Sequence, residues 1–349
     1  MIEEQLRETF ERHEILAPPS APLRAAIDRA VVRRRRNRFT KGLAAAAVAV
    51  AAAVSLPFAL GGTAALPPIG DTFLPADAPA VDRPLTVAVL GVDDDGGRSY
   101  RADTVLLAHV PAASHTAYLV SLPADLLVEI PGKGRAKLGE TFYFGSQRRG
   151  QGPDLAAGAQ LTAGTITATT GLPVDATVTV RYSGLRAVTD ALGGVEICLD
   201  RAVPSRHSGR VYPAGCQRLD GRTMLDLLRQ RYDLPHGAYD RDANGRAFVR
   251  GLIDTEVRDP VRLARVAQAA STGIDVAGTG ISTPELLRVA TGVDTVSPID
   301  IGSNFRPVTI ERVTYERLDP ARSGPVFAAI KENRLTDWVV ANPQSVRQR

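Results

Sequence analysis

Two stretches of the chain combine carboxylates and arginines at spacings that suit binding of a charged phosphate. In the first, an apolar run over residues 85–90 leads to Asp93, and a second apolar run begins just after Asp103. Two strands joined by the Gly- and Asp-rich loop between them would place Asp93 and Asp103 at one edge of a sheet, with Arg101 beside them. Carboxylates in such a position are ligands for a hard divalent cation.

The second stretch, residues 228–233, contains Arg229 and Arg231 two positions apart. On an extended segment we expect both side chains to point to the same side. Guanidinium groups form paired, charge-assisted hydrogen bonds with phosphate oxygens, so the two stretches together predict a metal-assisted phosphate site. The competing interpretation is that Asp93 only helps to form a turn, and that the two arginines pair with surface carboxylates.

Composition limits the classes of protein to which the chain can belong. Its 349 residues are 44% hydrophobic and 23% charged, which suits one or two globular domains with a sizeable core. The net charge is only +4 and much of the basic excess lies in one N-terminal cluster, so we do not expect nucleic acid as a partner. Cys198 and Cys216 form no zinc-binding motif, and the five histidines show no paired spacing.

The N-terminal region indicates a membrane anchor. Residues 42–60 carry no charge, and at about 1.5 Å per residue a helix of this length just spans a hydrocarbon core. A basic cluster that includes Arg33–Arg36 precedes this run, and no Lys or Arg follows it until Arg83, so the N-terminus is expected in the cytoplasm. A cleaved signal peptide is disfavoured because some 40 residues precede the run; a buried Ala-rich helix of the globular domain is the alternative.

We therefore divide the chain into five segments. These are a cytoplasmic segment (1–41), a transmembrane helix (42–62), a Pro- and Gly-rich linker (63–84), an extracytoplasmic domain (85–340) and a flexible tail (341–349). The expected location is the cell membrane, with a single pass. Outside the cytoplasm Cys198 and Cys216 could form a disulfide; the alternative is two separate buried thiols.

The pattern of the main domain predicts an α/β fold. Apolar runs suited to strands come early, with helix signals mixed in, which favours an α-β-α sandwich with a mixed central sheet covered by helices; an α+β arrangement of the same elements is the alternative. Strands are predicted at 85–90, 105–110, 117–122, 126–130, 176–182, 195–199 and 308–315. Helices are predicted at 154–170, 184–192, 220–228, 241–257, 260–272 and 284–290, and from residue 319 onward.

Several short motifs follow one another between residues 85 and 250. They are Leu90-Gly91-Val92-Asp93, Arg101-Ala102-Asp103-Thr104, Ser121-Leu122-Pro123-Ala124-Asp125, Glu129-Ile130-Pro131-Gly132 with Lys137-Leu138, Asp190-Ala191-Leu192-Gly193-Gly194-Val195, Leu219-Asp220-Gly221 and Arg229-Gln230-Arg231-Tyr232-Asp233. In type and order they resemble the motifs of the LytR–CpsA–Psr family of bacterial cell-wall proteins. Weaker similarity continues to near Asn333, and the expected anchor and linker also suit that family.

The resemblance implies a transferase that moves a glycan polymer from a polyprenyl-pyrophosphate carrier to peptidoglycan through a phosphodiester bond. It implies an apolar cavity for the lipid tail, with pyrophosphate and Mg²⁺ at its mouth, and membrane lipid as a further partner. By the match, the residues for each role are Asp93 and Asp103 for the metal, Arg101, Arg229 and Arg231 for catalysis, and Lys137, Arg241 and Asp125 for substrate binding.

The chain departs from the family pattern at three places. Ala124 stands where the family has Arg, Gly139 where Asn is usual, and Asn244-Gly245 where Arg or His and then Gln would follow Arg241. Each lost charge-assisted phosphate contact costs about 1.5–3 kcal/mol. The leading hypothesis is therefore a Mg²⁺-dependent phosphotransferase, and the second is a catalytically weak relative that binds polyprenyl-linked glycans or partners. An extracellular sensor whose cytoplasmic segment contacts a regulator is a third.

Overall fold

The structure is a computed structural model that describes residues 82–94, 100–148, 152–235, 237–255, 260–278, 295–299 and 305–346, together with single residues at 281, 286, 289, 293 and 301. The predicted cytoplasmic segment, transmembrane helix and nearly all of the linker lie outside these ranges. In the described part, no helix combines the length and the hydrophobicity needed to cross a membrane.

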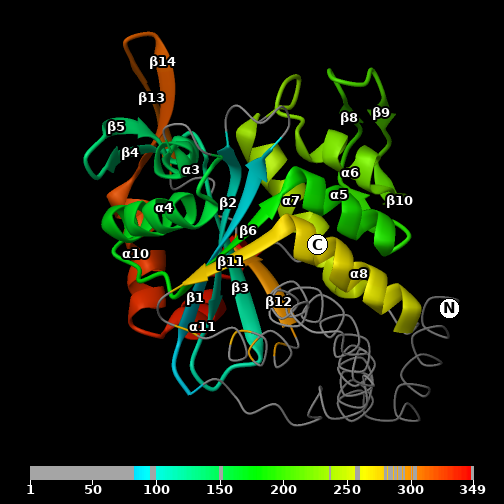
Figure 1. Ribbon diagram of the computed structural model, residues 1–349. Helices are drawn as coiled ribbons and strands as arrows, with labels where there is room; N and C mark the ends of the chain where they lie inside the picture. The colour runs from blue at the N-terminus through cyan, green and yellow to red at the C-terminus, as the bar shows by residue number, and fades with distance from the viewer. Residues whose placement is uncertain are drawn as a thin grey trace, which may run out of the picture.

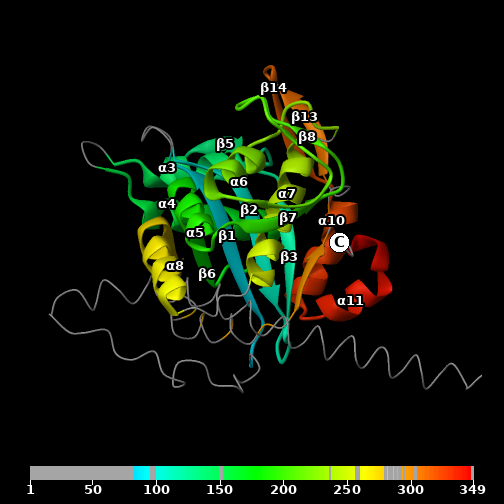
Figure 2. The same cartoon turned by 90° about the vertical axis from the view of Figure 1, so that its right-hand side faces the viewer.

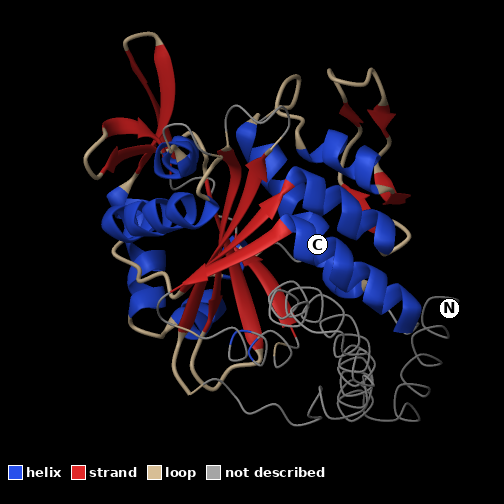
Figure 3. Cartoon of the chain, in the orientation of Figure 1, coloured by secondary structure: helices blue, strands red, loops and turns tan. Residues whose placement is uncertain are grey.

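A mixed β-sheet forms the centre of the domain (Figures 1 and 3). Three consecutive strands are antiparallel to one another, and a crossover strand pairs in parallel on each side of them. A sixth strand, at one edge, is antiparallel to its crossover neighbour. Within the described residues the strand order is β11 (Ile274–Gly278), β6 (Ala176–Arg181), β1 (Leu85–Asp93), β2 (Arg101–Val110), β3 (Thr116–Leu122) and β12 (Thr295–Ile299).

Helices lie on both sides of this sheet, which confirms the predicted α/β class (Figure 1). One side carries α3 (Thr141–Ser146), α4 (Leu155–Thr170), α10 (Pro320–Lys331) and α11 (Leu335–Ala341). The other carries α5 (Tyr182–Ala191), α6 (Gly221–Leu228), α7 (Ala238–Asp254) and α8 (Pro260–Gly273). Alternate residues of β1 explain the two layers, because Ala88 and Leu90 pack into one hydrophobic cluster while Leu85 and Val87 pack into another.

Local sequence signals set several helix boundaries. Asp154 caps α4 by accepting a hydrogen bond from the backbone N–H of Ala157, and Gly171, with φ at 72°, ends the helix. Asp220 caps α6 in the same way through Thr223. These are the positions at which the sequence predicts the helices to begin and end.

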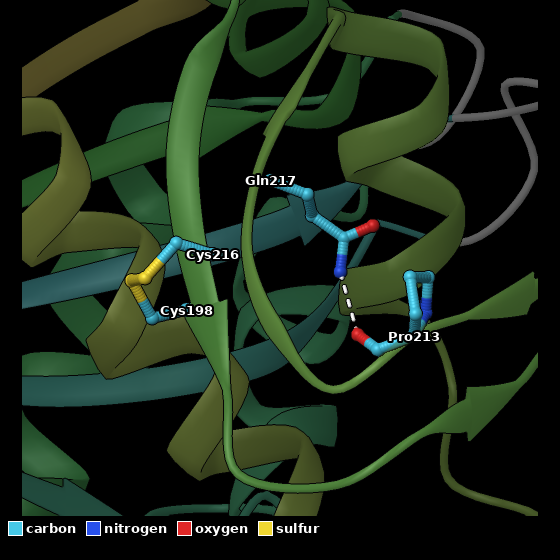
Figure 4. Close-up of a disulfide and its surroundings, with 4 residues drawn as sticks. All are labelled: Cys198, Pro213, Cys216 and Gln217. Atoms are coloured by element: carbon cyan, nitrogen blue, oxygen red, sulfur yellow. Dashed lines mark hydrogen bonds between the residues drawn. A yellow bond between two sulfur atoms is a disulfide. The ribbon is translucent and has the colours of Figure 1, made fainter.

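Small hairpins extend the domain beyond the central sheet. Next to α7 lies the hairpin of β7 (Val195–Leu199) and β10 (Gly215–Leu219), and Figure 2 shows β7 beside that helix. Cys198 and Cys216 are directly paired across it and form a disulfide (Figure 4). Of the two alternatives for these cysteines, the bridged one is therefore observed. The other hairpins are β4 (Leu127–Ile130) with β5 (Gly134–Lys137), β8 (Val203–Pro204) with β9 (Val211–Tyr212), and β13 (Phe305–Ile310) with β14 (Val313–Leu318).

The structure corrects four expectations. Arg229 is the C-cap of α6 in the helical region, so Arg229 and Arg231 leave a helix end and do not lie on an extended strand. The strand predicted at 308–315 is two strands, which turn at Glu311 and Arg312 with φ at 48° and 68°. Helix α5 begins at Tyr182, a residue assigned in advance to the preceding strand. Residues 341–349 were expected to form a flexible tail, but in its described part Pro343–Ser345 form a 3-10 turn and Val346 pairs with Ile299.

Candidate functional site

The β1–β2 hairpin places the two predicted metal ligands at one end of the central sheet. Asp93 pairs with Arg101, Val92 pairs with Ala102, and Gly91 pairs with Thr104. This shift in register leaves Asp103 as an extra residue in β2, a bulge of the kind that redirects a side chain out of the regular ladder.

Tyr182 connects these carboxylates to the arginine at the end of α6. Its side chain is buried, and its hydroxyl donates a hydrogen bond to Oδ2 of Asp103 at 3.0 Å. The guanidinium of Arg229 lies over the tyrosine ring, 5.4 Å from its centre, and Nη2 of Arg229 is 3.4 Å from Oδ2 of Asp93. Burial, together with the Asp103 carboxylate, raises the pKa of Tyr182 well above its ordinary value, so the hydroxyl stays a donor.

The sequence-based reasoning did not identify Tyr182 as part of the site. Tyr182 lies at the end of the strand predicted at 176–182, and this position could have identified it, because strand ends at this edge of the sheet carry other site residues. The contact with Asp103, however, joins residues 79 positions apart, and no local pattern predicts such a pairing.

Helix α7 contributes a buried pair of opposite charges. Arg241 is 5% exposed and Asp242 is 3% exposed, with 3.9 Å between Nε of Arg241 and Oδ1 of Asp242. Burial raises the pKa of Asp242 to about 6, while the positive charges of Arg241 and Arg246 oppose that rise. Within the described residues Nε and Nη2 of Arg241 have no hydrogen-bond partner. Buried donors are normally satisfied, so these two nitrogens suit an incoming anion.

A second group of charges lies around Asp125. Nζ of Lys137 is 2.7 Å from Oδ1 of Asp125 and lies over the ring of Tyr315 at 5.7 Å. The hydroxyl of Tyr232 accepts a hydrogen bond from Arg231 at 2.9 Å, and the negative charges of Asp125 and Asp103 add to the field that raises the pKa of Arg231. Arg231 is thus electrostatically coupled to both groups of charges.

Arg101 forms an ion pair with Glu140, a residue outside the two groups of charges described above. Its Nη2 is 3.1 Å from Oε1 of Glu140 in the 3-10 turn η2 (Leu138–Glu140), and both side chains are partly exposed. An ion pair of this kind is weak, because water screens it. Arg101 can therefore exchange Glu140 for a ligand at small cost.

Two of the departures from the family pattern lie against each other. The backbone N–H of Gly139 donates to the carbonyl of Ala124 at 2.8 Å. A Cβ added at Gly139 would lie 2.5 Å from the carbonyl oxygen of Ala102 and 3.2 Å from Cβ of Ala124. The usual Asn at position 139 would require the backbone to move, so this part of the site is built for small side chains.

The third departure leaves a gap on α7. Asn244 is buried, and its Nδ2 forms no hydrogen bond within the described part of the chain. A Cβ added at Gly245 would meet Cγ2 of Thr104 at an ordinary 3.9 Å, so there is room for at least a methyl group beside Thr104. Arg246, one residue later, is buried and contributes to the field at Asp242.

Asp93 and Asp103 can supply only part of the coordination of a magnesium ion. Among the described residues, no group of three or more His, Cys, Asp and Glu side chains could hold a metal. Mg²⁺ is commonly bound through one or two carboxylates, with water and substrate phosphates completing its coordination. Asp93 and Asp103 supply two carboxylates, which is sufficient when a pyrophosphate supplies the remaining oxygens.

A cavity of about 1310 Å³ opens between α7 and the β7–β10 hairpin. Asn244 and Arg246 line it from α7, and both disulfide cysteines line it from the hairpin. Its described lining mixes apolar side chains such as Leu199 and Leu234 with several arginines and carboxylates.

Comparison with proteins of known sequence identifies similar chains in bacterial cell-wall synthesis. The chain is 29% identical over 191 residues to the cell wall biosynthesis protein LcpA of Corynebacterium glutamicum, covering 49% of this chain and 37% of that protein. It is 31% identical over 174 residues to the polyisoprenyl-teichoic acid–peptidoglycan teichoic acid transferase TagU of Enterococcus faecalis, covering 49% and 53%. The chain thus spans between about a third and a half of the length of these two relatives.

Solved structures show the same fold, and the family model covers most of the chain. Bacillus subtilis TagU matches with a TM-score of 0.54 at 21% identity, covering 72% of this chain and 96% of that one. TagT bound to LIIa-WTA matches with a TM-score of 0.55 at 20% identity, covering 72% and 91%. The model of the LytR_cpsA_psr family matches residues 71–316. The chain, with its Asp93–Asp103 sheet edge and the arginines gathered there, therefore belongs to the LytR_cpsA_psr family.

Proposed function

We propose that this protein transfers a glycan polymer from a polyprenyl-pyrophosphate carrier to peptidoglycan through a phosphodiester bond. The observation that carries the proposal is the convergence of Asp93, Asp103 and Arg229 around one buried tyrosine, Tyr182. Arg241 is near enough for its charge to oppose the rise in the pKa of Tyr182. Family membership and the names of the TagU relatives support it.

The reaction exchanges one phosphorus–oxygen bond for another. An acceptor hydroxyl oxygen bonds to the phosphorus nearest the glycan, while the bond from that phosphorus to the bridging oxygen breaks. Polyprenyl phosphate leaves, and the hydroxyl proton passes to solvent. Most catalysis in such a transfer comes from positioning and from stabilisation of phosphate charge, so a set of fixed cations suits it.

The site residues bind either the phosphate groups or the metal ion. Arg229 and Arg231 hold non-bridging oxygens, and Arg241 donates through Nε and Nη2. Asp93 and Asp103 would hold Mg²⁺, which when bound offsets negative charge on the leaving phosphate. Arg101, Lys137 and Asp125 lie at the margin of the site, where Lys137 carries a point charge and Asp125 holds it in place.

We also propose that residues 42–62 anchor the protein in the cell membrane, with the domain outside the cytoplasm. The Cys198–Cys216 disulfide supports this orientation, because disulfides persist in oxidising compartments. A reporter enzyme fused after Gly62 should be active outside the cytoplasm. Activity of that reporter inside the cytoplasm would contradict the proposal.

The second candidate function is binding of polyprenyl-linked glycans with little or no transfer. The close packing of Ala124 against Gly139 and the gap at Asn244-Gly245 favour it, because each removes a potential phosphate contact. Lost contacts of this kind reduce a rate more than they reduce binding when they act on the transition state.

The test is transfer by the purified full chain, supplied with a polyprenyl-pyrophosphate-linked glycan, Mg²⁺ and peptidoglycan fragments. Release of polyprenyl phosphate and acceptor labelling are measured for the wild type and for Arg229→Gln and Arg241→Gln. We expect each variant to lose about ten- to a hundredfold in rate. Arg222→Gln, an exposed position on α6, is the matched control and should keep the wild-type rate.

Two outcomes would change the conclusion. Tight lipid binding by the wild type without any polyprenyl phosphate release favours the second candidate. Full activity of both Arg229→Gln and Arg241→Gln shows that the site lies elsewhere.

A further inference from the structure

Gln230 lies between the two arginines at the end of α6, Arg229 and Arg231, and its side chain is completely buried. Arg229 is the C-cap of the helix, and the backbone N–H of Gln230 donates to the carbonyl of Leu227 at 3.1 Å as the chain leaves it. A buried side-chain amide needs partners for its oxygen and for its nitrogen. Those partners decide what holds this segment in place.

The amide of Gln230 is bonded at both of its polar atoms. Oε1 accepts a hydrogen bond from the backbone N–H of Arg206 at 3.0 Å, and Nε2 donates to Oγ of Ser205 at 2.9 Å and to the carbonyl of Asp226 at 3.0 Å. A rotated amide would set its nitrogen against the N–H of Arg206 and its oxygen against the carbonyl of Asp226, so only one orientation fits. The segment after α6 is thus attached to the helix and to the loop of the β8–β9 hairpin.

The loop that this amide binds is itself held to α6. Oγ of Ser205, which is 4% exposed, accepts from the backbone N–H groups of His207 at 3.2 Å and Ser208 at 3.1 Å, and it donates to Oδ1 of Asp226 at 2.9 Å. The Asp226 carboxylate also accepts from the hydroxyls of Ser208 at 2.6 Å and Tyr212 at 2.5 Å. The loop therefore cannot shift relative to the helix without breaking several of these bonds at once.

Exposed side chains of the same loop also contact the segment after α6. The guanidinium of Arg206 lies 5.5 Å from the ring centre of Tyr232, and that of Arg231 lies 4.9 Å from the same ring centre. Nε of Arg206 is 3.0 Å from Oδ2 of Asp233, but both side chains are more than half exposed, so water screens this ion pair. The firm attachment of the segment is therefore the buried amide.

From these buried contacts, we propose that Gln230 is a positioning residue: it fixes the direction in which Arg229 and Arg231 leave the end of α6 and thereby sets the affinity of the site for a pyrophosphate group. The inference rests on the proposed function, since it is there that the two arginines are phosphate ligands. A guanidinium binds phosphate oxygens through a planar fork, so a displaced backbone loses paired contacts even though no charge is removed.

The test measures binding of inorganic pyrophosphate to the full chain by isothermal titration calorimetry, with Mg²⁺ present. Gln230→Leu removes the amide and keeps a side chain of similar size. We expect its Kd to rise about tenfold, as for the loss of one charge-assisted contact, with a shallower dependence on salt concentration. Ser205→Ala removes the partner hydroxyl in the loop and should raise Kd in the same direction.

Two controls separate positioning from a loss of stability. Asp220→Ala removes the N-cap at the other end of α6, so it should lower the melting temperature and leave Kd unchanged. Gln217→Leu removes a different amide, which donates to the carbonyl of Pro213 at 2.8 Å (Figure 4), and it should also keep the wild-type Kd. Unfolded protein lowers the number of sites in a titration without changing the affinity of the folded sites. An unchanged Kd in Gln230→Leu, or an equal rise in Asp220→Ala, would overturn the inference.

This outcome is separable from that of the transfer assay, because inorganic pyrophosphate carries neither lipid nor glycan. If Gln230→Leu binds pyrophosphate as the wild type does while Arg229→Gln abolishes transfer, the inference fails and the proposed function stands. If Gln230→Leu weakens pyrophosphate binding while the wild type shows no transfer, the inference stands and the transferase proposal fails. A wild type that binds no pyrophosphate also overturns the inference.

Discussion

Tyr182 and Asp103 are joined by a 3.0 Å hydrogen bond from the tyrosine hydroxyl to the carboxylate Oδ2. The same ring supports the guanidinium of Arg229 at 5.4 Å from its centre. One side chain at the start of α5 thereby orients both an expected metal ligand and an expected phosphate clamp. Tyr182 acts through these neighbours, so we regard it as a positioning residue.

Tyr182→Phe keeps the ring under Arg229 and removes only the hydroxyl. We expect the Mg²⁺ concentration for half-maximal transfer to rise about tenfold, because partners that orient a metal ligand typically contribute that much to affinity. Tyr118→Phe is the matched control, since it removes a hydroxyl bonded to Thr336 at 3.2 Å, on the side of the sheet that carries α11. An unchanged Mg²⁺ dependence in Tyr182→Phe would exclude this role for the hydroxyl.

Asp242 should make stability depend on pH. Burial raises its folded-state pKa from 3.8 to about 6, so the folded protein holds this proton more tightly than the unfolded chain does. The stabilisation from this tighter proton binding is therefore complete below about pH 4. As the pH rises from there through 6, the free energy of unfolding falls by about 3 kcal/mol. Asp242→Asn should lack this change in the free energy of unfolding, measured by urea denaturation at pH 4 and pH 7.

The surface variant Asp337→Asn serves as the control for that measurement, because it removes an exposed carboxylate from α11. It should keep the pH dependence of the wild type. If Asp242→Asn and the wild type lose the same stability between pH 4 and pH 7, the Asp242 carboxyl does not titrate in this window.

Gly245 and Gly251 occupy the same helix and should respond oppositely to alanine. A Cβ at Gly245 has room, with Thr104 Cγ2 at 3.9 Å, so Gly245→Ala should stabilise the protein by about 0.5–1 kcal/mol through helix propensity. A Cβ at Gly251 would lie 2.2 Å from the carbonyl oxygen of Glu196, so Gly251→Ala should destabilise it. Thermal denaturation of both variants measures the difference, and equal melting temperatures would contradict the packing described for α7.

The disulfide should hold the cavity wall in place. Its cysteines are 18 positions apart, and replacing both by Ser should lower the free energy of unfolding by about 3 kcal/mol on an entropic model. A reducing agent should produce a similar loss in the wild type and no further loss in the double variant. Comparable stability of the oxidised wild type and the double variant would show that the hairpin is held by other contacts.

The sequence alone was sufficient to predict the features that depend on residues close to one another along the chain. The Asp93 and Asp103 pair could be predicted because a short loop joins two apolar runs, and a hairpin of this kind brings its ends together. Caps such as Asp154 and the mixed α/β order follow from equally local signals. The motif order was enough to indicate the family, which the match over residues 71–316 confirms.

Other features depend on contacts between distant parts of the chain. The end of α6 at Arg229, the hydrogen bond of Tyr182 to Asp103 and the packing of Ala124 against Gly139 each arise where separate elements meet. Periodicity reports which face of an element is apolar, but it does not report which face of another element will cover it. The sequence by itself therefore determined the elements, the family and the charged residues at the sheet edge. Only tertiary structure decided which of these charges are buried together, because burial and pairing are properties of the packed chain.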